Sequence, residues 1–181
     1  MIICIAGLSG CGKNTVGRLV AEKLNLRIVD PTFKTIAKKE KMALLDFHKK
    51  AEKEHKIDKE FDRRLIADAD KGDCVVTTWL GPWMIKKADL RVWLHAPAAI
   101  RAKRISGRDG MKEEEALAHI EERDSANRAR YKAVYGIDIY DHSGFDLVIN
   151  SAVLSPEQSS ETIAAAAKAK MARAKKSSGK K

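Results

Sequence analysis

The stretch that decides the fold is GLSGCGKNT, residues Gly7 to Thr15. Its spacing is G-x-x-x-x-G-K, the pattern of a phosphate-binding loop, with Gly7, Gly12 and Lys13 at the fixed positions. In such a loop the glycines let successive backbone N–H groups face a phosphate, and the following helix adds the positive end of its dipole. The lysine reaches the β- and γ-phosphates. The stretch therefore predicts a site for a nucleoside triphosphate.

The residues on either side of the loop support this interpretation over a chance glycine turn. Residues 2–6, IICIA, form a continuous apolar run of the kind found in buried parallel strands. After the loop, apolar residues recur with the period of a helix and predict an amphipathic helix from about Lys13 to Leu24. The apolar positions of that helix are Val16, Leu19, Val20 and Leu24.

We expect a nucleoside triphosphate to contact the whole loop segment, with Lys13 as a catalytic residue that reaches its β- and γ-phosphates. The expected contacts are Gly7, Leu8, Ser9, Gly10, Cys11, Gly12, Lys13, Asn14 and Thr15.

Asn14 occupies the position where this loop ordinarily has a serine or threonine whose hydroxyl helps to hold Mg²⁺. Its side-chain carbonyl oxygen is an acceptable ligand for a hard cation, and Thr15 is a second candidate. Since Mg²⁺ keeps several waters when bound, we expect the substitution to weaken metal coordination without abolishing it. The expected cofactors are a nucleoside triphosphate and Mg²⁺, with Asn14 as a metal ligand.

The rest of the chain alternates between strand and helix patterns, which predicts an α/β fold with a parallel sheet of about five strands flanked by helices. Ligands bind such sheets beyond the carboxyl ends of the strands, where the glycine loop lies. The further strands are expected in LRIVDP (26–31), CVVTTW (74–79), LRVWLH (90–95) and DLVIN (146–150).

Helical segments fill the intervals between these strands. The very polar region from Thr32 to about Lys71 has helical faces and no strand pattern. Pro97 begins a helix that the stretch RISGRDG (104–110) is expected to break as a mobile loop. A long charged helix follows from about Lys112 to Tyr135, and a closing helix starts at Pro156 and ends in the tail.

The charge of the chain is unevenly distributed. The 181 residues carry a formal net charge of +10, but seven of the basic residues and no acid lie between Lys168 and Lys181. Residues 1–167 therefore hold 28 basic and 25 acidic residues, a net charge of +3. We expect one domain over residues 1–167 and a disordered basic tail over residues 168–181, with contact to nucleic acid possible only through that tail.

Cysteine use and hydropathy bear on where the protein is found. Cys4, Cys11 and Cys74 show no C-x-x-C spacing, which favours a reducing, cytoplasmic compartment. The apolar start of the chain lacks a basic segment before it, and no apolar run approaches the ~20 residues of a membrane span. We expect a cytoplasmic monomer that binds small-molecule nucleotides and no membrane.

Three further stretches resemble one enzyme family: IDKEFDRRL (57–65), ADLRVWLHAPAAIRAKRI (88–105) and RYKAVYGIDIYDHSGFDLVIN (130–150). With these and the glycine loop, residues 1 to about 165 resemble a nucleoside monophosphate kinase with the P-loop NTPase fold, and most of all the archaeal cytidylate kinases. The resemblance implies transfer of the γ-phosphoryl group of ATP to CMP or dCMP, with Mg²⁺ required.

The resemblance also implies roles for segments and residues. Residues 32–71 would form the helical subdomain that binds the monophosphate, and residues 104–110 would form the lid. RDSANRAR (123–130) resembles the family pattern R-D-x-x-D-x-x-R. The implied catalytic residues besides Lys13 are Arg104, Arg108, Arg123 and Arg130, and the implied substrate contacts are Lys34, Arg63, Trp79, Asp124 and Asn127.

Several positions depart from the family pattern near the acceptor. Thr77 and Trp79, in TTWLGPWM, stand where the family tends to have an acid and an arginine, and Asn127 stands in place of an aspartate. Lys34 similarly replaces an arginine. Two alternatives therefore stay open: a P-loop protein without fast phosphoryl transfer whose tail binds RNA or the ribosome, and a kinase for another monophosphate or small metabolite.

Overall fold

The structure, a computed structural model, describes residues 1–31 and 55–178. Its strands are β1 (Ile2–Ala6), β2 (Arg27–Val29), β3 (Cys74–Val76), β4 (Leu90–His95) and β5 (Leu147–Asn150). Its helices are α1 (Lys13–Leu24), α4 (His55–Ala69), α5 (Gly81–Met84), α6 (Ala98–Asp109), α7 (Glu113–Tyr135) and α8 (Pro156–Ser178).

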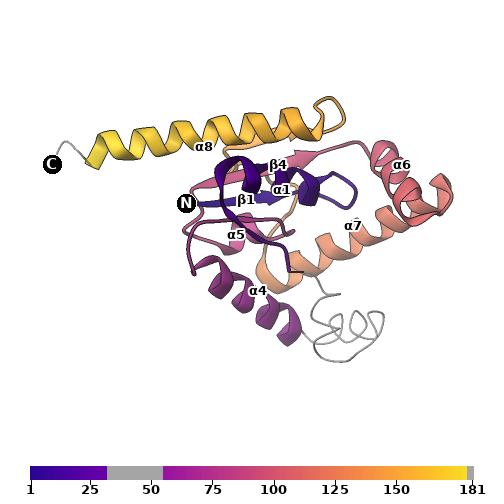
Figure 1. The fold of residues 1–181 in the computed structure, drawn as a ribbon. Helices are drawn as coiled ribbons and strands as arrows, with labels where there is room; N and C mark the ends of the chain where they lie inside the picture. The colour runs from indigo at the N-terminus through magenta and orange to yellow at the C-terminus, as the bar shows by residue number, and fades with distance from the viewer. Residues whose placement is uncertain (32–54, 179–181) are drawn as a thin grey trace.

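The five strands form one parallel sheet in the order β2-β3-β1-β4-β5 (Figure 1). The central strand β1 pairs with β3 on one side and with β4 on the other, with Cys4 opposite Val76 and Arg91. Because all strands point the same way, their carboxyl ends lie at one edge of the sheet, and the glycine loop leaves β1 at that edge. The predicted α/β class and the parallel sheet are confirmed.

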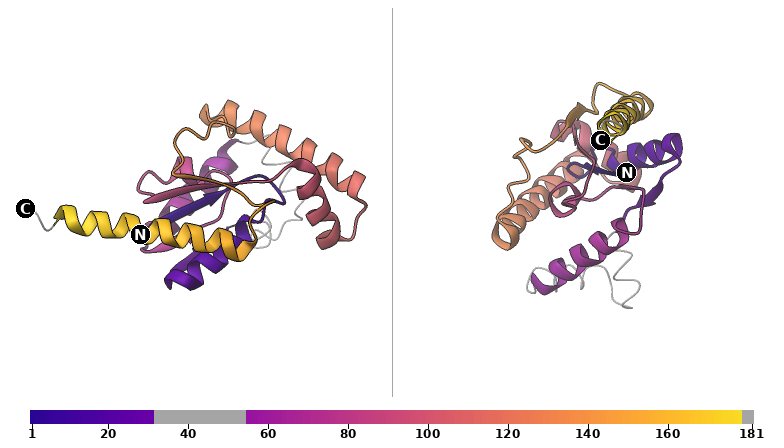
Figure 2. Two further views of the ribbon diagram at one scale, coloured as in Figure 1. Left: turned by 90° about the horizontal axis from the view of Figure 1, so that it is seen from above. Right: turned by 90° about the vertical axis from the view of Figure 1, so that its left-hand side faces the viewer.

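The two faces of β1 face different helices, as the alternation of side chains along a strand requires. Ile3 and Ile5 pack in a cluster with residues of α1 and α8 on one face. Ile2 and Cys4 pack with residues of α4 on the other face, where α5 also lies against the strand. Helices thus cover both faces, which is why the run IICIA is apolar throughout (Figure 2).

Three aspartates fasten the amino-terminal edge of the sheet. Asp89 accepts a hydrogen bond from the Ile2 N–H at 2.7 Å, and Asp146 accepts one from the Arg91 N–H at 2.7 Å. Asp73 pairs with the amino terminus of Met1. Each carboxylate therefore accepts a hydrogen bond or ion pair from a nitrogen at the start of β1 or β4.

Two expectations about the helices are wrong. Residues 104–110 do not form a loop, because α6 continues through Gly107 and ends at Asp109, before Gly110. Ala102 and Ile105 of α6 pack against α7, and this burial outweighs the cost of about 1 kcal/mol for a glycine inside a helix.

The basic tail is also helical where the structure describes it. Helix α8 continues to Ser178, so the expected disorder from Lys168 is wrong for residues 168–178. Alanine, lysine, arginine and methionine, which predominate in that stretch, are among the strongest helix formers.

The third strand is shorter than expected and ends at Val76. Lys34 and the first part of the polar region, residues 32–54, lie outside the described residues. Among the described helices, none combines the length and the apolar character of a membrane span.

The contact between Gly17 and Thr77 provides a test of how tightly α1 packs on β3. A Cβ atom added at Gly17 would lie 2.1 Å from Thr77 Cγ2, whereas at Gly107, also inside a helix, it would meet no atom within 4 Å. We expect Gly17→Ala to lower the free energy of unfolding by about 1–3 kcal/mol. Gly107→Ala should raise it by roughly 0.5–1 kcal/mol. Urea denaturation measures both changes.

Thr77→Ser removes the methyl group that an alanine at position 17 would meet. The double variant should therefore recover part of the stability lost in Gly17→Ala alone. Equal losses in the single and the double variant would contradict the assigned contact.

Candidate active site

The glycine loop presents backbone N–H groups that have no protein acceptor. Gly12 has φ 91° and caps α1, a backbone conformation that favours glycine. Within the loop the Cys11 N–H donates to the Leu8 carbonyl at 3.2 Å, and Val16 N–H donates back to Gly12 at 3.0 Å. Within the described residues no acceptor is found for the remaining amides of the loop and of the first turn of α1, those of Ser9, Gly10, Gly12, Lys13 and Asn14. These groups are available to an anion at a helix N-terminus.

Arg101 of α6 holds the carbonyl side of the loop. Its Nη1 donates to the Ser9 carbonyl at 3.0 Å and to Asp124 Oδ2 at 2.7 Å, and its Nε donates to the Ala96 carbonyl at 3.1 Å. The side chains of Arg101 and Asp124 are only 6% and 7% exposed. The approach is close, since a Cβ at Gly10 would lie 2.8 Å from the Arg101 carbonyl oxygen.

Arg104 makes a second connection between the loop and the sheet. Its Nη1 donates to the Gly10 carbonyl at 3.4 Å, and its Nη2 donates to the Ser151 carbonyl at 2.5 Å. The Ser151 hydroxyl in turn donates to the Cys11 carbonyl at 2.7 Å. Arg104, predicted to be catalytic, thus lies against the back of the loop in this structure.

The ammonium group of Lys13 lies over an aromatic ring at the mouth of the site. Its Nζ is 5.8 Å from the centroid of the Trp79 ring. Burial lowers the pKa of Lys13, and the positive charges of Arg123 and Arg108 lower it further, against the opposite effects of Cys11 and Asp124. No carboxylate of the described residues forms an ion pair with Lys13. A bound polyphosphate would supply the missing negative charge.

The other predicted arginines lie in two different settings. Arg123 is exposed on α7, and Arg108, near the end of α6, donates from Nε and Nη2 to Asp109 at 2.7 and 2.6 Å. Both are close enough to Lys13 to affect its pKa. Arg108 and Arg123 therefore act electrostatically on Lys13, and their catalytic role stays a prediction.

A line of side chains leads from Lys13 toward α4. Beyond Trp79, the Tyr131 ring lies at a centroid distance of 6.3 Å, and the Arg130 guanidinium is 5.2 Å from the Tyr131 centroid. Arg130 Nη2 donates to Asn127 Oδ1 at 2.9 Å, and its Nε is 3.7 Å from Asp58 Oδ2. Three predicted residues, Trp79, Asn127 and Arg130, are therefore neighbours between the loop and α4.

Asp62 extends this cluster and was not among the predicted site residues. Its carboxylate accepts a hydrogen bond from the Tyr135 hydroxyl. Burial raises the pKa of Asp62 to about 6, with Asp58 adding to the rise and the hydrogen bond from Tyr135 opposing it. The spacing of Asp58 and Asp62, one helical turn apart, was the only sequence signal that they share a face of α4.

Arg63 does not face the cluster. It is exposed on α4, where its Nη2 lies 2.9 Å from Glu60 Oε2 and its Nε donates to the Lys59 carbonyl at 3.4 Å. Both partners lie on its own helix.

Two neutral side-chain oxygens lie beside the first turns of α1. Asn14 is half-buried at the start of α1. The hydroxyl of Thr77, buried beside α1 at Gly17, has no hydrogen-bond partner among the described residues. Gly17 is three residues after Asn14, so both lie on the same face of the helix. Oxygen donors of this kind suit Mg²⁺, although the described residues contain no cluster of three acidic, histidine or cysteine side chains that could hold a metal alone.

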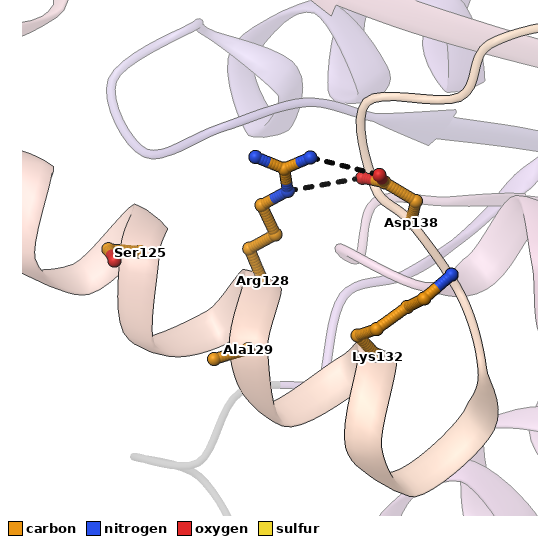
Figure 3. A pocket seen from close by; sticks show the side chains of 5 residues that line it. All are labelled: Ser125, Arg128, Ala129, Lys132 and Asp138. Carbon is orange, nitrogen blue, oxygen red and sulfur yellow. Dashed lines mark hydrogen bonds and ion pairs between the residues drawn. The ribbon is translucent and has the colours of Figure 1, made fainter.

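A surface pocket lies apart from this site. It has a volume of about 360 Å³ and lies on the outer face of α7 (Figure 3). Arg128 Nε and Nη2 donate to Asp138 at 3.3 and 2.9 Å across it, so these two charges neutralise each other. The buried residues Asp124 and Tyr131 are on the opposite, inner face of α7. The lining residues are Ser125, Arg128, Ala129, Lys132 and Asp138.

Comparison with known proteins identifies the family. The model of the cytidylate kinase-like family matches residues 2–153. The chain belongs to this family. The cytidylate kinase of Pyrococcus horikoshii is 43% identical over 159 residues, which cover 87% of this chain and 83% of that protein. That of Sulfurisphaera tokodaii is 40% identical, covering 91% and 94%. The chain is thus a phosphotransferase of the kinase class.

Solved structures support the same fold. Shikimate kinase from Bacteroides thetaiotaomicron has a TM-score of 0.61 at 17% identity, covering 90% of this chain and 95% of that one. Deoxyadenosine kinase from M. mycoides, with dCMP and dCDP bound, has a TM-score of 0.55 at 17% identity, covering 93% and 100%. These are P-loop kinases, which confirms the predicted fold.

The Asp62 carboxyl gives the kinase a measurable pH dependence of stability. In the folded protein its pKa is about 6, above the ordinary value of 3.8. Between these two pH values the folded state retains a proton that the unfolded state has lost, so stability falls as pH rises through this window. Asp62→Asn removes this loss. Its stability relative to wild type should therefore rise by up to about 3 kcal/mol between about pH 4 and about pH 7.

Urea denaturation across this pH range measures the difference. Tyr135→Phe is the matched control, because it removes the hydrogen bond that favours the charged carboxylate and should move the window to higher pH. Parallel stability curves for wild type and Asp62→Asn would show that the carboxyl titrates normally.

Proposed function

We propose that this protein transfers the γ-phosphoryl group of ATP to CMP or dCMP, producing ADP and CDP or dCDP. The observation that supports this most directly is the row of unpartnered amides before α1, with Lys13 beside them. Family membership and the curated cytidylate kinases similar to this chain supply the acceptor.

In the proposed mechanism the loop fixes the donor and the cations neutralise its charge. The amides of Ser9, Gly10, Gly12, Lys13 and Asn14 bind the phosphate oxygens, and the Lys13 side chain reaches the β- and γ-phosphates. Since the transition state spreads negative charge over the equatorial oxygens, the forked donors of Arg108 and Arg123 suit a role at the moving group. Asn14 and Thr77 would supply protein oxygens to Mg²⁺, which would offset the negative charge of the phosphates.

The acceptor would lie between the loop and α4. Arg130 is half-buried there with Trp79, Tyr131 and Asn127 around it, so it can reach a monophosphate brought in from the α4 side. Asp124 acts through Arg101 in this proposal: it orients the guanidinium that holds the loop. It is therefore a positioning residue. Residues 32–71 would close over the acceptor, and the turn after α6 would close over the donor.

The cellular setting follows from the cysteines. Cys4, Cys11 and Cys74 are all buried and unpaired, which fits a reducing compartment. We infer a cytoplasmic monomer that uses nucleotides as small-molecule substrates. The alternative of a P-loop protein without transfer has no support in the described residues or in the relatives.

ADP formation from ATP and Mg²⁺ with CMP, dCMP, UMP, AMP and GMP tests the proposed function. We expect CMP and dCMP to be phosphorylated fastest. Lys13→Ala should reduce kcat by at least about 100-fold, because the lysine neutralises charge that develops in transfer. Lys23→Ala, an exposed lysine further along the same helix, is the control and should leave the rate unchanged. ATP binding without turnover on any acceptor would contradict the proposal.

Asn14→Thr tests the metal assignment, because it restores a hydroxyl at the position that ordinarily contacts Mg²⁺. We expect higher activity at limiting Mg²⁺ and little change at saturation. Asn14→Ala should lower activity at limiting Mg²⁺, so that a higher Mg²⁺ concentration is needed for half-maximal rate. A Mg²⁺ titration of initial rates measures this, and identical midpoints for all three proteins would show that the side chain is not a ligand.

A further inference from the structure

Helix α8 leaves the body of the protein after Lys170. Up to that point it packs on α1, with Ile163 and Ala167 fully buried. Lys170 is the last anchor: its Nζ donates to the Asp89 carbonyl and to Asp146 Oδ1, both at 2.6 Å. Beyond Lys170 the helix continues to Ser178. It extends past the sheet in Figure 1 and in the left-hand view of Figure 2.

We call residues 168–178 the basic arm. Met171 is 43% exposed, and Lys168, Arg173 and Lys176 are also exposed. Among the described residues none of these three cations has an acidic partner, whereas Lys170 does. No acid occurs after Glu161, so nothing in the arm balances its charge. At 1.5 Å per residue the arm is about 16 Å long.

The composition of the arm decides what it can bind. Its apolar side chains are alanines and a single methionine, which is too little for the wide apolar face that an interfacial membrane helix requires. There is no aromatic residue on which a base could stack. What remains is a column of positive charge, and its chemical complement is a regularly spaced polyanion.

We propose that the basic arm binds the phosphate backbone of nucleic acid, without reading its sequence. The arm is at the amino-terminal edge of the sheet, where Asp89 and Asp146 anchor it, and the glycine loop is at the opposite, carboxyl edge. A nucleic acid held by the arm therefore leaves the nucleotide site open. This activity is separate from phosphoryl transfer, and the two can fail independently.

The test compares the full-length protein with two variants of equal net charge. The arm variant is Lys168→Gln, Arg173→Gln and Lys176→Gln together. The control variant is Lys23→Gln, Lys71→Gln and Lys86→Gln, three exposed lysines on the body. Fluorescence anisotropy with a labelled single-stranded RNA of roughly 20 nucleotides and mixed sequence measures binding between about 50 and 200 mM salt.

We expect the arm variant to bind at least about tenfold more weakly at low salt, with the slope of log K against log salt shallower by about 2. The control variant should bind nearly as wild type, and CMP phosphorylation should be unchanged in both. Equal loss in the two variants, or no binding by wild type, would overturn the proposal. So would stronger binding to vesicles of acidic lipid than to RNA, or a wild-type dimer that the arm variant lacks.

Discussion

The backbone between Gly7 and Lys13 is in a conformation that only an anion, or an external support, can stabilise. Among the described residues no acceptor is found for the N–H groups of Ser9, Gly10, Gly12 and Lys13, and an amide left unpaired on burial costs about 1–3 kcal/mol. The structure offsets this from the other side of the loop. Three of its carbonyls, those of Ser9, Gly10 and Cys11, accept hydrogen bonds from Arg101, Arg104 and Ser151. The loop is thereby preorganised, so a triphosphate need not order it.

The Arg101–Asp124 pair extends this support to α7. A buried ion pair is weak evidence for stability, because removing two charges from water cancels much of their attraction. One oxygen of Asp124, Oδ1, has no hydrogen-bond partner among the described residues, which adds to that cost. We therefore interpret the pair as fixing geometry. It sets the position of α7, and with it Arg123 and Arg130, relative to the loop that holds the donor.

The parts of the fold that local patterns determine could be predicted from the sequence. β1, the loop and α1 follow from a buried strand, fixed glycines and a helical period within 24 residues. The loop prediction for RISGRDG (104–110) was wrong because the helical state depends on packing against Ala116 and Ile120 of the next helix, α7, which the local pattern does not contain. Arg101 could not be found in this way, since its partner Ser9 is 92 residues away. The prediction of disorder for the basic arm was wrong because the helix propensity of alanine and lysine outweighs the repulsion between its like charges.

Trp79 shows how a departure from the family pattern can fit the electrostatics of the site. An arginine at this position would add a positive charge near Lys13, whose pKa burial and neighbouring arginines already lower. The indole ring instead faces the ammonium, an attraction of roughly 0.5–2 kcal/mol depending on desolvation. It also packs on Tyr131, whose ring is in contact with the Arg130 guanidinium. The indole ring thus gives an uncharged contact between Lys13 and the ring of Tyr131.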